Sequence, residues 1–205
     1  MHPVRLPRAS TTAGTDRRAR PETRAAILGA AVDLASAEGL EGLTIGRLAT
    51  ETGMSKSGLF RHFGSKEELQ LATVEEASRI FVAAVVEPAL RAPEGEERLR
   101  ALCDRYIAHL EQQTFAGGCF WGATTAEFDD RPGAVRDAIA GAYGAWTTEL
   151  ARQARLAADA DPEQLAFELV SVAQGANSRY RLFGDGDAFA RARTAFEGLL
   201  AAQRS

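Results

Sequence analysis

Residues 44–69 read TIGRLATETGMSKSGLFRHFGSKEEL. Two short amphipathic segments in it are separated by Gly53, a residue that readily takes the left-handed conformation that ends one helix and redirects the chain. Thr44 and Ser55 precede the two segments and are good N-caps, because their side-chain oxygens accept hydrogen bonds from unpaired backbone N–H groups. The sequence therefore predicts two short helices joined by a tight turn, as in a helix-turn-helix.

The second of these helices is predicted to keep a polar surface outward. Leu59 and Phe63 are spaced to face a core. The first turn offers free N–H groups and the positive end of the helix dipole, which favour phosphate. Two interpretations stay open here: ordinary solvated charges on a small helix, or a recognition helix that enters the major groove of double-stranded DNA. The outward residues are Lys56, Ser57, Arg61 and His62.

A capping box follows at Ser65 and Glu68, whose side chains are placed to bond each other's backbone N–H groups at the start of a helix. We expect that helix to run to about Leu90 and to be broken near Pro88 and Pro93. Lys66 lies in its first turn, where the ammonium group is placed to neutralise a phosphate.

Helical spacing continues in both directions from this stretch. Upstream, Ile27, Ala31 and Leu34 recur at three- and four-residue spacing between Pro21 and Gly39. No stretch alternates with period two, so the predicted fold class is all-α, with an N-terminal three-helix helix-turn-helix DNA-binding domain and a C-terminal helical domain. Downstream, helices are expected at roughly 95–114, 119–129, 133–158, 162–183 and 187–203.

Charge is distributed unevenly along the 205 residues. The net charge is −4, but residues 1–70 hold ten Lys and Arg against eight Asp and Glu, whereas the remainder holds fourteen against twenty. This asymmetry is compatible with a DNA-facing head on an acidic body. A non-specific architectural DNA-binding protein would carry a much larger basic excess.

The composition disfavours several protein classes. No apolar run reaches the roughly eighteen residues of a transmembrane helix, and the first residues lack the apolar stretch of a secretion signal, so we expect a cytoplasmic protein with no membrane partner. Cys103 and Cys119 have no Cys or His nearby at metal-ligand spacing, so no metal is expected. Paired carboxylates, a nucleophile with an adjacent base and a phosphate loop are also missing, so we expect neither an enzyme nor a cofactor.

Residues 27–71 resemble the tetracycline-repressor (TetR) family of bacterial regulators. The resemblance implies a homodimer that binds an operator of two-fold symmetry, usually as a repressor that a small-molecule effector releases. The matching residues are Ile27-Leu28, Ala30-Ala31, Gly39, Leu43-Thr44-Ile45, Leu48-Ala49, Gly53, Ser55-Lys56 and the run Leu59-Phe60-Arg61-His62-Phe63-Gly64-Ser65-Lys66-Glu67-Glu68-Leu69.

The resemblance also implies which residues face DNA. Position 60 is often tyrosine in the family, with a hydroxyl that is able to bond a phosphate. Phe60 has no hydroxyl, which puts that contact in doubt and leaves contact with a thymine methyl group or a sugar. By position, the DNA-facing residues are Thr44, Ser55, Lys56, Ser57, Phe60, Arg61, His62 and Lys66.

Between residues 81 and 146 the chain places large side chains near small ones, such as Gly117, Gly118 and Gly122. Each aromatic residue alone is better explained as core packing, but together they predict a mostly apolar cavity for a hydrophobic or aromatic effector. His109 is expected to be a surface or hydrogen-bonded histidine rather than an effector contact. The expected effector-binding residues are Phe81, Val85, Cys103, Tyr106, Ile107, Cys119, Phe120, Trp121, Thr124, Phe128, Tyr143 and Trp146.

The segment 162–183 is apolar on two sides, with Leu165 and Leu169 in one stripe and Ala166 and Val170 in the other. A helix that is apolar on two faces needs two partners, so we expect one stripe in the chain's own core and the other against a second subunit. The family resemblance places the dimer contact at the last two helices. The expected interface residues are Ala166, Val170, Ala173, Asn177, Phe189, Phe196 and Leu200.

These expectations divide the chain into three parts. Residues 1–20 are a flexible basic tail, residues 21–67 the DNA-binding domain, and residues 68–205 the effector-binding and dimerisation domain. The helix that starts at Ser65 is the expected lever between the two domains, because its start borders the DNA-binding domain and its end borders the cavity.

Overall fold

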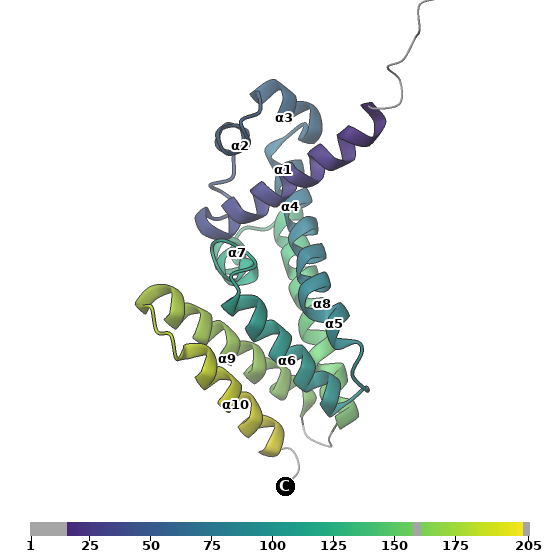
Figure 1. The fold of residues 1–205 in the computed structure, drawn as a ribbon, viewed down its shortest axis with the longest axis vertical. Coiled ribbons are helices and arrows are strands. Elements are labelled where there is room, and N and C mark those ends of the chain that lie inside the picture. The colour runs from purple at the N-terminus through teal and green to yellow at the C-terminus, as the bar shows by residue number, and fades with distance from the viewer. Residues whose placement is uncertain (1–15, 158–160, 203–205) are drawn as a thin grey trace, which may run out of the picture.

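The computed structural model describes residues 16–157 and 161–202. Within these ranges every regular element is a helix, which confirms the predicted all-α class. Figure 1 shows a small head, formed by the first three helices, above a larger helical body. Among the described residues, no helix combines the length and the apolar character that crossing a lipid bilayer requires.

The head consists of α1 (Asp16–Glu38), α2 (Ile45–Thr52) and α3 (Lys56–Phe63). Thr44 Oγ1 accepts a hydrogen bond from the Arg47 N–H at 3.0 Å, and Ser55 Oγ accepts one from the Gly58 N–H at 3.1 Å. Gly53 ends α2 with a φ of +67°, in the left-handed region. Both predicted N-caps and the predicted turn are therefore confirmed.

The first helix begins earlier than the sequence predicts. Pro21 suits a first helical turn because proline has no N–H to leave unpaired there. In the structure α1 already begins at Asp16, so Pro21 lies inside the helix and forgoes one backbone hydrogen bond. Residues 16–20 are thus helical, and the rest of the predicted tail, residues 1–15, lies outside the described residues.

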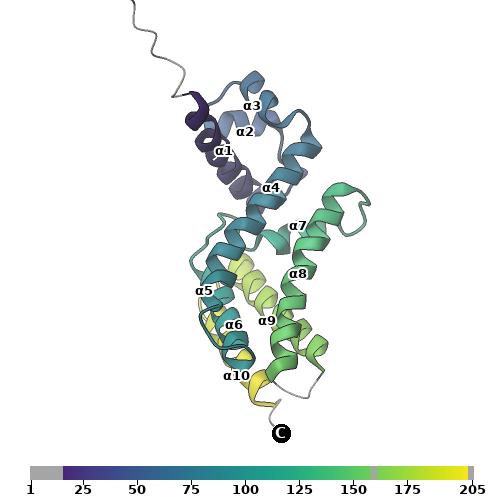
Figure 2. The same ribbon diagram turned by 90° about the vertical axis from the view of Figure 1, so that its right-hand side faces the viewer.

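Helix α4 (Lys66–Phe81) connects the head to the body (Figure 2). Ser65 Oγ accepts a hydrogen bond from the Glu68 N–H at 3.0 Å. The Ser65 N–H donates to the Phe63 carbonyl oxygen at 2.6 Å, because the chain turns sharply at Gly64, which has a φ of +67°. The predicted capping box has two reciprocal hydrogen bonds, and the structure shows the one that the Ser65 side chain accepts.

A π-helical turn, η1 (Val82–Val86), separates α4 from the short α5 (Glu87–Ala89). The Glu87 N–H donates to the Val82 carbonyl oxygen, five residues earlier. Pro88 accounts for the wider turn, since in a regular α-helix its ring would collide with the carbonyl group four residues earlier. The interruption that the sequence predicts near Pro88 is therefore confirmed.

The body is a bundle in which α9 packs along both α8 and α10, while α6 lies against α8 and α10 (Figures 1 and 2). Its core is filled by side chains such as Leu99, Leu102, Leu169 and Phe189, all of which are buried. The helices are α6 (Glu96–Glu111), α7 (Phe120–Phe128), α8 (Ala134–Ala157), α9 (Pro162–Phe183) and α10 (Ala188–Ala202).

The loop before α7 attaches the body to α1. The Gly117 N–H donates to Ser36 Oγ at 2.8 Å, and the Ala116 N–H donates to Asp33 Oδ1 at 3.2 Å. A Cβ atom on residue 117 would lie 2.0 Å from the Ser36 carbonyl oxygen, so this close approach requires glycine. The head is therefore connected to the body through the loop before α7 as well as through α4.

Candidate DNA interface and effector site

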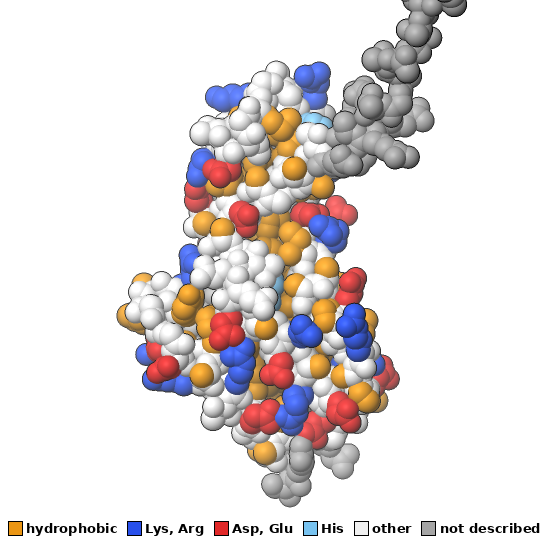
Figure 3. All heavy atoms as spheres, viewed as in Figure 1, with side chains coloured by type: hydrophobic (Ala, Val, Ile, Leu, Met, Phe, Trp, Pro, Cys, Tyr) orange, Lys and Arg blue, Asp and Glu red, His pale blue; other side chains and the backbone are white. Residues whose placement is uncertain are grey.

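One side of α3 is exposed at the end of the molecule opposite α10 (Figure 1). Leu59 and Phe63 are buried in the head, as the sequence predicts. Phe60 is 56% exposed although it is aromatic. Figure 3 shows basic groups at this tip of the head. The exposed side of α3 carries Lys56, Ser57, Phe60 and Arg61.

The Lys56 side chain reaches the first turn of α2. A Cβ atom on Gly46 would lie 3.7 Å from Lys56 Nζ and 3.8 Å from Thr44 Oγ1. The ammonium group thus stands beside the N-terminal end of α2, where the helix dipole and free N–H groups also favour an anion. Two predicted DNA-facing residues, Thr44 and Lys56, therefore share one corner that suits a phosphate group.

Three other polar residues near this surface have partners within the chain. Lys66 Nζ donates to the carbonyl oxygen and to the carboxylate of Glu41, each at 2.9 Å. Arg47 pairs with Glu38 at 2.6 Å, and the half-buried His62 ring lies against Phe63. A phosphate contact by Lys66 would have to replace the Glu41 contacts, so the DNA role of Lys66 stays a prediction.

In the body, Phe81 is the centre of an aromatic cluster. Its ring lies edge-on to the rings of Tyr106 and His109 from α6, at centroid distances of 5.7 and 5.4 Å. It also lies edge-on to Trp121 from α7 at 6.4 Å and to Trp146 from α8 at 5.1 Å. Four helices therefore meet at one ring.

A cavity of about 450 Å³ opens beside this cluster, between α4, η1, α7 and α8. Phe81, Trp121 and Trp146, three of the predicted effector residues, line it. Sequence reasoning missed its other lining residues, although Ser78, Val82, Val86 and Leu90 recur every four residues and so share one side of a helix. The remaining lining residues are Ala142, Ala145, Glu149 and Arg152.

A second, more polar groove of about 790 Å³ lies between α8 and α9. Tyr143 and Gln174 line it. Gln174 Nε2 donates to the Tyr106 hydroxyl at 2.8 Å and to Cys119 Sγ at 3.1 Å, so two predicted effector residues are hydrogen-bonded behind this groove. Burial raises the pKa of Tyr106 and, less strongly, that of Tyr143, so both phenols are neutral. No sequence signal pointed to Gln174.

The other predicted effector residues line neither of these two cavities and are buried in the core of the chain. Thr124 was expected to offer a polar group, but its hydroxyl donates to the Phe120 carbonyl oxygen of its own helix at 2.9 Å. For these side chains the structure favours core packing. They are Val85, Cys103, Ile107, Phe120, Thr124 and Phe128.

His109 departs from the sequence expectation. It is buried, its Nδ1 has no hydrogen-bond partner among the described residues, and its ring packs edge-on against Phe81 and Phe115. Burial lowers its pKa to about 4, so the ring is neutral at physiological pH. The expectation of a surface or hydrogen-bonded histidine is therefore wrong, because helical spacing does not reveal how deeply α6 is covered.

The described residues also contain no cluster of His, Cys, Asp or Glu arranged to hold a metal ion.

The predicted dimer residues lie elsewhere than the sequence suggests. Ala166 and Val170 face the groove toward α8, while Tyr180 of the other stripe packs on Phe189 of α10, with ring centroids 5.0 Å apart. Both stripes of α9 are thus covered within the chain, and the inference that one of them needs a second subunit is corrected. Only Asn177 is partly exposed among the seven residues. The six buried ones are Ala166, Val170, Ala173, Phe189, Phe196 and Leu200.

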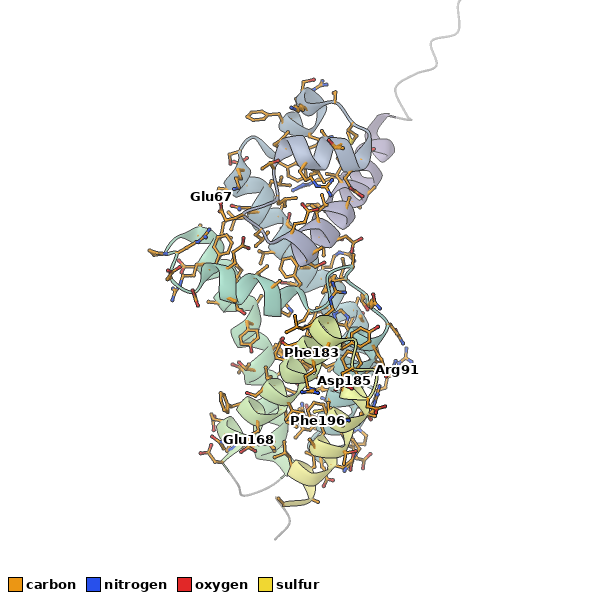
Figure 4. All side chains as sticks on the ribbon, turned by 90° about the vertical axis from the view of Figure 1, so that its left-hand side faces the viewer. Glu67, Arg91, Glu168, Phe183, Asp185 and Phe196 are labelled. Carbon is orange, nitrogen blue, oxygen red and sulfur yellow. The ribbon has the colours of Figure 1, made fainter. Side chains whose placement is uncertain are left out.

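A different side of α9 carries exposed apolar groups. Phe167, Leu182 and Phe183 are 66, 76 and 69% exposed. Between Phe167 and Leu182 the same side presents small residues, including Ser171 and Ser178, which are also exposed. Figure 4 looks onto α9 and α10 and labels Glu168 in the first half of α9 and Phe183 at its last residue. We call this side of α9 the outer face.

Comparisons with known proteins identify the family. Residues 27–73 match the family model of the tetR family of bacterial regulatory proteins, and residues 95–196 match that of the tetracyclin repressor-like C-terminal domain. The chain belongs to the TetR family. It is therefore a DNA-binding transcriptional regulator with a helix-turn-helix head and a ligand-binding body. No curated protein matches the chain significantly.

Solved structures of TetR regulators share this fold. One from Streptomyces coelicolor is 24% identical with a TM-score of 0.78, and the match covers 90% of this chain and 97% of that one. One from Chloroflexus aurantiacus is 23% identical with a TM-score of 0.79, covering 91 and 98%. AibR, solved with isovaleryl coenzyme A and operator DNA, is 23% identical with a TM-score of 0.66, covering 86 and 95%.

Acid should destabilise this TetR regulator through His109. The pKa of His109 is about 4 in the folded chain against an ordinary value of 6.5, so below pH 6.5 the unfolded chain binds a proton that the folded chain does not. The free energy of unfolding should therefore fall between pH 6.5 and 4, by up to about 3 kcal/mol from this group. Urea unfolding at several pH values measures it. In His109→Phe the free energy of unfolding should change much less between pH 6.5 and 4. His62→Phe leaves His109 intact and should show the same decrease as the unmodified chain.

Proposed function

We propose that this TetR regulator is a repressor that binds a palindromic operator as a homodimer and leaves it when a small apolar or aromatic effector occupies the cavity beside Phe81. The observation that carries the proposal is the exposed side of α3, which offers Lys56 and Arg61 on a helix at the tip of the head. Membership of a family of transcription regulators supports the same role.

The geometry of the head supports DNA as the partner. The buried Leu59 and Phe63 fix α3 with its polar side outward, while Lys56 stands at the start of α2. Such an arrangement allows α3 to lie in a major groove while the start of α2 meets the phosphate backbone. Phe60 then offers an apolar surface for a thymine methyl group.

The outer face of α9 supports a homodimer. Large exposed side chains such as Phe167 and Leu182 are unfavourable on a monomer in water, and patches of this kind usually mark a contact surface. The small residues between them allow another helix to approach closely. A two-fold dimer would place two copies of α3 to meet successive half-sites of a palindrome, about 34 Å apart.

The cavity beside Phe81 supports an apolar effector. Its volume of about 450 Å³ lies within the usual range for small-molecule sites. Rings and aliphatic side chains form most of its wall, while Glu149 and Arg152 provide polar groups. AibR, which shares the fold, has been solved in complex with isovaleryl coenzyme A and operator DNA, so this fold is able to bind both a small molecule and DNA.

DNA binding should depend on Lys56 and Arg61. We expect Lys56→Ala and Arg61→Ala each to weaken binding to DNA selected from a random pool, and each lost phosphate contact should lower the salt slope by about one ion. Fluorescence anisotropy at several salt concentrations measures both quantities. Arg79→Ala, which removes an exposed arginine of α4 paired with Glu76, is the matched control. Wild-type affinity in a folded double variant would refute the assignment of α3.

Dimer formation should depend on the outer face of α9. Phe167→Glu combined with Leu182→Glu should convert a dimer into a monomer at micromolar concentration, because each change puts a charge into an apolar contact. Light scattering gives the mass directly. Phe60→Glu changes another exposed phenylalanine, on α3 in the head and away from α9, and should leave the mass unchanged. A monomeric wild-type chain would contradict the proposal.

Effector binding should depend on the wall of the cavity beside Phe81. Intrinsic fluorescence during titration with a panel of apolar aromatic compounds will reveal binding, since Trp121 and Trp146 both line the cavity. Trp121→Ala should weaken a binding compound at least about tenfold through lost ring contact. Tyr143→Ala should have little effect, and the opposite result would move the effector to the groove between α8 and α9.

A further inference from the structure

The turn between α1 and α2, residues Gly39 to Glu41, is bonded by two helices of the body at once. From α7, the Glu127 carboxylate accepts hydrogen bonds from the Leu40 N–H at 2.7 Å and from the Glu41 N–H at 3.0 Å. From α4, Gln70 Nε2 donates to the Leu40 carbonyl oxygen at 2.8 Å. The two helices thus hold opposite polar groups of one short turn.

The approach of Glu127 depends on the residue at position 39. Gly39 has a φ of +81°, and a Cβ atom there would lie 2.6 Å from Glu127 Oε1. Glycine therefore permits both the left-handed backbone and the close carboxylate. Within the described residues, the Leu40 and Glu41 N–H groups donate hydrogen bonds to the Glu127 carboxylate and to no other group.

Helix α7 also forms part of the cavity wall, through Trp121. Trp121 and Glu127 are six residues apart on one regular helix, so about 9 Å of axial rise separates the cavity from the turn. A displacement of Trp121 by a bound molecule would be carried to Glu127 as a movement of one rigid element. On the α4 side, the lining residues Val82 and Val86 belong to the π-helical turn, which is less regular than α7.

We infer that Glu127 is a positioning residue that couples occupancy of the cavity to the orientation of the DNA-binding head, with α7 as the connecting element. This inference rests on the proposed function, because it names the route by which the effector acts. When the cavity fills, α7 shifts and the carboxylate leaves the Leu40 and Glu41 N–H groups. The turn that leads into α2 is then held from α4 alone, through Gln70 and Lys66, and the head changes its orientation relative to the body.

A cavity-filling substitution tests this route without an identified effector. Ala142→Phe places a ring in the cavity, and site-resolved hydrogen exchange then reports the Leu40 and Glu41 amides in the full chain. In the wild-type background the substitution should raise their exchange rates by about tenfold or more and weaken binding to the selected DNA by about tenfold. In a Glu127→Ala background both amides should already exchange fast, and Ala142→Phe should change neither quantity further.

Matched variants separate coupling from loss of stability. Glu127→Gln keeps one acceptor oxygen and should give an intermediate response, while Glu76→Ala removes a carboxylate that pairs within α4 and should leave the response intact. An equal response to Ala142→Phe with and without Glu127, or no response in the wild-type background, would overturn the inference. The exchange measurement needs no DNA, so failure of the wild-type chain to bind any selected sequence would reject the proposed function separately.

Discussion

The edge-on packing of Phe81 against four rings is the contact on which both halves of the molecule depend. Phe81 is the last residue of α4, and its partners come from α6, α7 and α8, so one buried ring fixes where the helix from the head enters the body. Edge-on geometry suits aromatic rings because the positive edge of one faces the negative face of another. The same ring forms a wall of the cavity, so a bound molecule would touch the point at which the helices converge.

The junction between head and body is held by polar bonds of a different character. Glu127 and Gln70 bond the backbone of the turn at Leu40, and Gly117 bonds Ser36 of α1. A hydrogen bond exchanged for one to water changes stability by only about 1 kcal/mol, whereas separating an apolar interface costs about 25 cal/mol for every Å² exposed. One continuous cluster of buried apolar side chains also runs from the head into the body, so these polar bonds act together with apolar packing at the junction.

The sequence predicted the helices because their signals are local. N-caps such as Thr44 and Ser55, and the proline at the start of α9, act within one turn, and the helices begin and end within a few residues of the expected positions. The assignment of faces failed where the signal is not local. Apolar spacing shows that a side of a helix is covered but not by what. Val170 and Phe196 are predicted to contact a second chain, although α8 packs on the helix of Val170 and α9 and α6 pack on the helix of Phe196. His109 was misplaced for the same reason.

The candidate site was only partly predictable because a cavity is a gap in packing, and the sequence records only the atoms around it. The aromatic content of the sequence correctly predicts that Phe81, Trp121 and Trp146 line the cavity. Phe120 and Phe128 are aromatic as well, but they are buried in the core and line neither cavity. The wall completed by Val82 and Leu90 lies on a helix that Pro88 forces into a π turn, so the local geometry there departs from regular spacing. Glu127 carries no motif at all, since its role arises only when the fold brings α7 within 2.7 Å of the Leu40 N–H, 87 residues away in sequence.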